Sequence, residues 1–139
     1  MARVGLVLVS HGPLADSLRE TVNVLEPGDT GDVVALSLAW DESPENASAR
    51  LEKAIRGADT GTGVVLLTDM FGGTPANLGL SLLAEGKVEV LTGVNLPMLL
   101  KLATSRSVST PPAALGEMAR LIKYYGQKNI SVASEFLSQ

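Results

Sequence analysis

The sequence contains no cysteine and few aromatic residues, and both absences narrow what the chain is able to form. Without cysteine there is neither a disulfide framework nor a thiolate metal site. Only 4% of the 139 residues are aromatic whereas 45% are hydrophobic, so leucine, valine and alanine must fill the core. A chain of this length fits one domain, and we expect a single domain over residues 1–139.

Long apolar runs and basic clusters are also missing. No apolar stretch approaches the roughly 20 residues that a membrane-spanning helix needs. The run at residues 4–9 is too short for the apolar region of a signal peptide and leads into a polar turn, which favours a buried strand. The net charge is −4 and no lysine–arginine cluster exceeds a pair, which disfavours nucleic acid as a ligand. We therefore expect a cytoplasmic chain without direct membrane insertion.

Continuous apolar runs alternate with segments of helical spacing. Residues 4–9 and 64–68 have the pattern of strands that are covered on both faces in a parallel sheet, and residues 33–38 and 88–91 are weaker examples. Apolar residues at helical spacing follow the first three runs, at residues 14–25, 47–55 and 76–83. This order predicts a flavodoxin-like α/β domain, with an open, mostly parallel sheet and helices on both faces.

The C-terminal part of the sequence predicts one more helix and a final strand. Residues 115–125 keep one apolar face after a polar loop at residues 105–112, and Gly126 is expected to end the helix. Residues 129–136 have the composition of a short strand. Because a terminal strand with no helix after it leaves an open edge, we expect this strand to be exchanged in a homodimer.

The residues that directly follow strands are the candidates for chemistry, because ligands of open α/β sheets bind outside the carboxyl ends of the strands. The only histidine, His11, follows the first predicted strand, and Asp69 follows the third. If these strands are neighbours, Asp69 lies beside His11 and holds one ring nitrogen, which leaves the other nitrogen free as a nucleophile. This pairing indicates catalysis by His11 and Asp69, with a phosphoryl group accepted on His11.

A glycine-rich turn opens the helix that follows Asp69. Gly72 and Gly73 precede a helix N-terminus, where exposed backbone amides bind anions, and Thr74 is placed to cap the helix or to donate its hydroxyl to a phosphoryl oxygen. These three residues are the phosphoryl-binding candidates. The alternatives are that the glycine pair is only a turn and that Asp69 forms an Asx turn.

Partner-docking candidates lie in two of the same loops. Met70 and Phe71 either dock a partner or fold back onto the core, and Asn95 is either a helix start or a third wall of the crevice. Three acidic residues after the second strand are expected to form a solvated face: Asp41, Glu42 and Glu45.

Three separated motifs occur in an order that resembles a known family. They are SHG at residues 10–12, DMFGGTPAN at 69–77 and GVNLPML at 93–99. Together they resemble the mannose-type (mannose/fructose/sorbose) enzyme IIA domain of the phosphoenolpyruvate-dependent sugar phosphotransferase system. The likeness spans essentially the whole chain, is most specific in the second motif and is weakest after about residue 105.

The resemblance implies a phosphotransferase component that works without cofactor or metal. In that reading His11 becomes a phosphohistidine by transfer from the carrier protein HPr and passes the group to an enzyme IIB domain for sugar uptake. Asp69 orients the histidine, Thr74 lies close to the phosphoryl group, and the protein is a homodimer with exchanged C-terminal strands. Members are commonly fused to IIB, whereas this chain ends at Gln139, so we expect IIB on a separate chain.

Three alternative functions remain beside this one. The chain is a stand-alone regulatory phospho-switch, a phosphoryl donor to a dihydroxyacetone kinase, or, more distantly, a small tetrapyrrole metal chelatase. Small chelatases also place a histidine–glycine pair after their first strand, but metal sites usually need three or more protein ligands. For phosphoryl transfer, we expect the group on the ring nitrogen that Asp69 does not hold.

Overall fold

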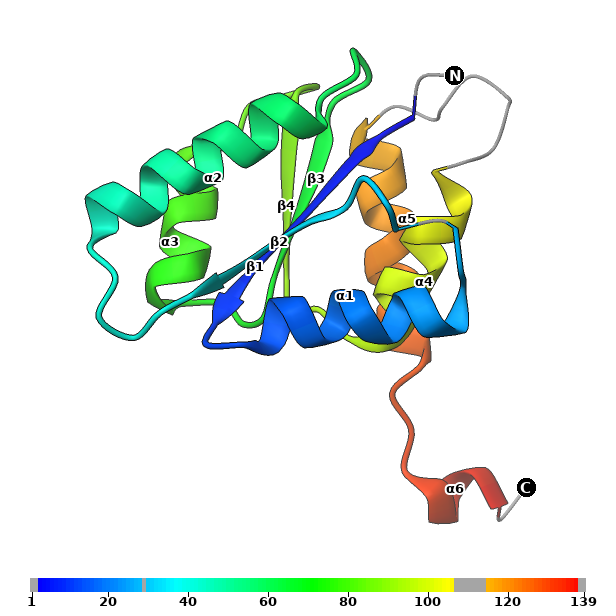
Figure 1. Cartoon of the computed structure of the whole chain (residues 1–139). Coiled ribbons are helices and arrows are strands. Elements are labelled where there is room, and N and C mark those ends of the chain that lie inside the picture. The colour runs from blue at the N-terminus through cyan, green and yellow to red at the C-terminus, as the bar shows by residue number, and fades with distance from the viewer. Residues whose placement is uncertain (1–2, 29, 107–114, 138–139) are drawn as a thin grey trace.

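The computed structural model of the chain describes residues 3–28, 30–106 and 115–137. In these ranges strands and helices alternate, as Figure 1 shows. The elements in chain order are β1 (Gly5–His11), α1 (Leu14–Leu25), β2 (Val34–Leu38), α2 (Pro44–Ala58), β3 (Val64–Thr68), α3 (Gly73–Ser81), β4 (Val88–Thr92), α4 (Leu96–Ser105), α5 (Leu115–Lys128) and α6 (Ala133–Leu137). The polar loop expected at residues 105–112 lies, from residue 107 on, outside the described residues.

The strands form one parallel sheet in the order β2-β1-β3-β4. At the carboxyl edge His11 pairs with Leu38 of β2, and Val9 pairs with Thr68 of β3. The predicted α/β fold is confirmed, and so is the neighbourhood of β1 and β3. The loops that follow these two strands therefore open at the same edge of the sheet.

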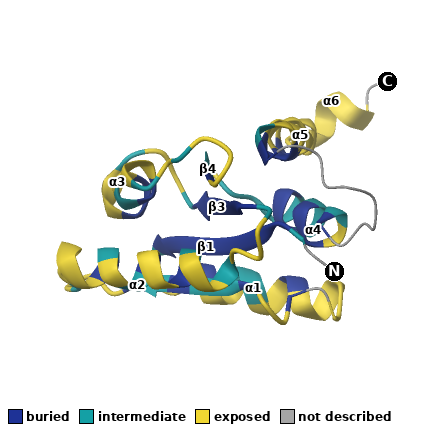
Figure 2. Ribbon diagram, turned by 90° about the horizontal axis from the view of Figure 1, so that it is seen from above, coloured by how far each residue is buried: buried dark blue, intermediate teal, exposed yellow. Residues whose placement is uncertain are grey.

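Helices cover both faces of the sheet, and the alternation of side chains along each strand divides the core in two. Leu6 and Leu8 of β1 pack with α1, α4 and α5, whereas Val7 and Val9 pack with α2 and α3. Figure 2 shows the buried strands between these two layers. Burial on both faces explains why the strands read as continuous apolar runs. Among the described residues, no helix is both long and apolar enough to cross a membrane.

Gly126 does not end the last long helix, contrary to the prediction. α5 continues to Lys128, and Gly126 lies buried within it against Met98 of α4. A Cβ at position 126 would lie 2.6 Å from Met98 Sδ, so the missing side chain lets α4 and α5 approach each other. Close packing between helices, and not the end of a helix, accounts for this glycine.

The strand predicted at residues 129–136 is also wrong. The segment folds into the short helix α6, in which the amides of Glu135 and Phe136 donate to Val132 O at 3.0 and 3.2 Å. A strand needs a neighbouring strand for its backbone groups, whereas a helical turn satisfies them locally. α6 extends away from the rest of the chain (Figure 1). The exposed apolar side chains of this C-terminal segment are Ile130, Val132, Phe136 and Leu137.

Candidate functional site

His11 is the last residue of β1, in a loop that local hydrogen bonds hold. Gly12 turns the chain towards α1 with φ +53°, and its amide donates to Leu38 O at 3.0 Å. The buried Ser10 Oγ accepts a 2.7 Å hydrogen bond from the Ala15 amide at the start of α1. That amide has no partner within the helix, so Ser10 supplies the missing acceptor. The imidazole that this loop presents is 30% exposed.

Asp69 lies beside His11, as the strand order predicts. One carboxylate oxygen of Asp69, Oδ2, is 2.8 Å from His11 Nδ1 and also accepts from the His11 amide at 3.1 Å. The other oxygen, Oδ1, accepts from the Met70 amide at 3.2 Å. Because a carboxylate only accepts hydrogen bonds, the proton of the neutral imidazole lies on Nδ1. His11 Nε2 therefore carries the free lone pair.

The free nitrogen of His11 faces the beginning of α3. A Cβ at Gly73 would lie 2.8 Å from His11 Nε2 and 3.0 Å from Cε1, so only glycine leaves the imidazole its place. Gly73 and the preceding Gly72 both have positive φ, and no side chain caps α3. Uncapped amides at a helix N-terminus attract anions. The phosphoryl-binding candidates Gly72, Gly73 and Thr74 thus open a helix that points at Nε2.

A small pocket of about 120 Å³ adjoins the imidazole, and Thr74 and Trp40 line it together with His11. The indole of Trp40 is stacked beside His11, with 6.1 Å between the ring centroids and 26° between the ring planes. The sequence analysis did not select Trp40. Its available signal was its position two residues after β2, at the same edge of the sheet as His11.

Glu42 does not belong to a solvated face, although Asp41 and Glu45 are exposed as predicted. The side chain of Glu42 is only 7% exposed, and both of its oxygens accept from Arg50 Nη1 at 2.6 and 2.7 Å. Asn46 Nδ2 donates to Oε2 at 2.8 Å. The hydrogen bonds from Arg50 lower the pKa of Glu42 from its ordinary value. Glu42 thereby ties the loop after β2 to α2.

The docking candidates separate into exposed and engaged residues. Met70 and Phe71 are 54% and 74% exposed, so they do not fold back onto the core. Asn95 is a helix start: its Oδ1 accepts from the Met98 amide at 3.0 Å, and its Nδ2 donates to Gly126 O at 3.3 Å. Of the two readings of Asn95, the structure therefore gives the helix cap, and Asn95 is absent from the pocket beside His11.

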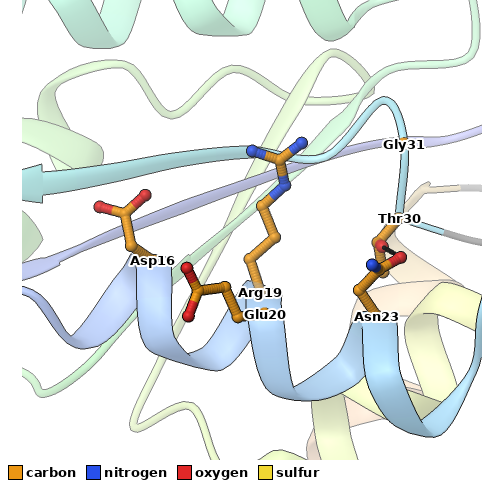
Figure 3. Close-up of a pocket in the computed structure, with 6 residues that line it drawn as sticks. All are labelled: Asp16, Arg19, Glu20, Asn23, Thr30 and Gly31. Carbon is orange, nitrogen blue, oxygen red and sulfur yellow. Dashed lines mark hydrogen bonds between the residues drawn. The ribbon is translucent and has the colours of Figure 1, made fainter.

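A second groove, of about 270 Å³, runs along α1 and the loop before β2, and it contains none of the predicted site residues. Figure 3 shows its polar lining: Asp16, Arg19, Glu20, Asn23, Thr30 and Gly31. Thr30 Oγ1 donates to Asn23 Oδ1 at 2.8 Å within it. In the part of the chain that the structure describes, no three His, Cys, Asp or Glu side chains are grouped to hold a metal ion.

Residues 5–119 match the family described as "PTS system fructose IIA component". The chain belongs to this IIA family. The matched range includes the His11 loop, Asp69 and the opening of α3. This IIA chain is accordingly a component of the sugar phosphotransferase system of the mannose, fructose and sorbose type. Membership supports a phosphotransferase role.

Individual relatives cover the IIA chain to different extents. The "PTS system fructose-specific EIIA component" of Bacillus subtilis is 26% identical over 137 residues, which are 98% of this chain and 90% of that protein. The "PTS system mannose-specific EIIAB component" of Escherichia coli K12 is 29% identical over 104 residues, 74% of this chain but 32% of that protein. The crystal structure of the PTS IIA protein associated with the fucose utilization operon of Streptococcus pneumoniae is similar over 99% of both chains, with a TM-score of 0.82 and 25% identity.

Proposed function

We propose that this IIA chain is a phosphocarrier that accepts a phosphoryl group from phospho-HPr on His11 Nε2 and passes it to an enzyme IIB domain in sugar uptake. The observation that carries the proposal is the 2.8 Å contact between His11 Nδ1 and Asp69 Oδ2, which leaves Nε2 free towards the opening of α3. Family membership supports the phosphotransferase system as the setting. HPr, IIB and a cytoplasmic location belong to the proposal.

The proposed step needs a neutral imidazole with its proton on Nδ1. The Nε2 lone pair attacks phosphorus, the Nε2–P bond forms, and the N–P bond of the donor phosphohistidine breaks with its electron pair returning to the donor nitrogen. The His11 ring gains positive charge, which the Asp69 carboxylate stabilises. The amides of Gly73 and Thr74 stabilise the oxygens of the transferring group. In the onward step the acceptor attacks phosphorus and the electron pair returns to Nε2.

Two exposed apolar surfaces fit the partners of this reaction. Met70 and Phe71 directly follow Asp69, and we place them in the surface that contacts HPr and IIB, because exposed aromatic residues often anchor protein interfaces. The exposed apolar residues of the C-terminal segment support a homodimer in which a second copy covers them.

The test is transfer of label from phosphoenolpyruvate through enzyme I and HPr to the purified chain. We expect one acid-labile phosphate on wild-type protein and none on His11→Gln, since the sequence contains no other histidine. A mannose-type IIB domain should then discharge the phosphorylated chain. An unlabelled wild-type chain in the presence of charged HPr, or a labelled His11→Gln variant, would contradict the proposal.

A further inference from the structure

Trp40 occupies a place that burial does not explain. It is the only tryptophan of the chain, and it is 81% exposed, so it adds little to the core. Its indole nevertheless lies against the turn after His11, since a Cβ at Gly12 would be 2.9 Å from Trp40 Cζ2. With 6.1 Å between their centroids, the indole and the imidazole are within the range of interacting aromatic rings.

The turn that carries Trp40 is held from both sides. The Glu42 amide donates to Ala39 O at 3.1 Å, and the Ala39 amide donates to Glu42 Oε1 at 3.3 Å. Glu42 is in turn bonded by Arg50 of α2 through both carboxylate oxygens. A turn closed by hydrogen bonds and anchored to a helix keeps its side chain oriented before a partner arrives.

Trp40 restrains the one motion that the other contacts of His11 leave open. Asp69 holds Nδ1, and Gly73 lies at the Nε2 edge of the ring. A ring bonded through one nitrogen is still able to tilt out of its plane, and the indole beside its face obstructs that tilt. An indole face also attracts a cation, which is the charge that the His11 ring acquires during attack.

We propose that Trp40 is a positioning residue, which keeps the His11 imidazole aligned for phosphoryl transfer and stabilises the ring once it is charged. The inference rests on the proposed role of His11. Trp40 acts through the imidazole and takes no part in the bonds that form and break. Its removal should therefore slow the chemical step with any phosphoryl donor, whereas a docking residue would matter only for a protein donor.

The experiment compares two donors in single-turnover reactions, phospho-HPr and the small molecule phosphoramidate. With phosphoramidate the Nε2–P bond forms, the P–N bond breaks with its electron pair, and the nitrogen leaves as ammonia. We expect Trp40→Ala to lower the maximal rate about tenfold with both donors, and Trp40→Phe to regain most of it. The half-saturating concentration of phospho-HPr should change by less than about twofold. Tyr124→Ala on α5, an exposed aromatic residue outside the site, serves as the matched control.

Two results would overturn the inference. If Trp40→Ala slows transfer only from phospho-HPr, through a raised half-saturating concentration, Trp40 docks the donor and does not position His11. If Trp40→Ala reacts as fast as wild type with both donors, the ring contact has no role in transfer. Failure of the proposed function has a different signature, in which wild-type protein reacts with phosphoramidate and not with phospho-HPr. Circular dichroism and thermal unfolding establish that each variant is folded.

Discussion

Gly73→Ala places a methyl group at the nucleophilic nitrogen and therefore tests the geometry of the site. The new Cβ would lie 2.8 Å from His11 Nε2, whereas ordinary van der Waals contact begins at 3.4 Å. The imidazole must move away, and its hydrogen bond with Asp69 must lengthen or bend. Because a displacement of about 1 Å in a reacting group costs about 100-fold in rate, we expect phosphorylation of His11 to slow about 100-fold.

The backbone contributes a second effect that a control variant removes. Gly73 has φ +83°, and a side chain in that region costs about 1–2 kcal/mol of stability. Gly86 has φ +75° and no atom within 4 Å of the position of a Cβ, so Gly86→Ala shares the backbone cost without the contact with His11. Initial rates with saturating phospho-HPr and thermal unfolding should be measured on both variants. Wild-type rates in Gly73→Ala, or equal slowing in Gly86→Ala, would refute the reasoning.

Three further predictions concern charge and packing. Asp69→Asn should slow transfer about 100-fold with an unchanged melting temperature, because an amide stabilises the charged ring less well, and an unchanged rate would remove Asp69 from the mechanism. The hydrogen bonds from buried Arg106 lower the pKa of Asp32, so its stabilising effect is present above the unfolded pKa of about 3.9 and is lost as the pH falls through the lower, folded pKa. Asp32→Asn should therefore cost about 1–2 kcal/mol at pH 7 in urea unfolding, a discounted value because the carboxylate is 45% exposed, and the difference should shrink below about pH 4; a gap independent of pH would contradict this. Leu67→Ala should lower the free energy of unfolding by about 3 kcal/mol, since Leu67 is fully buried in the middle of the sheet, and a loss below about 1 kcal/mol would contradict the packing.

The sheet and the pairing of His11 with Asp69 were predictable because both follow from local patterns and a general rule. All five residues of β3 are buried, which a strand covered on both faces requires, and they form a continuous apolar run in the sequence. Once β1 and β3 are neighbours, the residues after them meet at one edge of the sheet. No information from distant side chains was needed.

The features that sequence analysis missed depend on contacts between distant segments. Gly126 looks like a helix stop until the neighbouring Met98 is known. Residues 129–136 have strand composition, but a strand also needs a partner, and helical hydrogen bonds form instead. The place of Trp40 beside His11 depends on the turn that Glu42 and Arg50 hold, which no periodicity encodes.

The central claim is that Asp69 holds Nδ1 and leaves Nε2 as the nucleophile, and nitrogen NMR of the phosphorylated protein tests it most directly. The chain is labelled with ¹⁵N in its single histidine and charged through phosphoenolpyruvate, enzyme I and HPr. The account predicts phosphate on Nε2 with the proton retained on Nδ1. Phosphate on Nδ1, or none on His11 while HPr is charged, would contradict it.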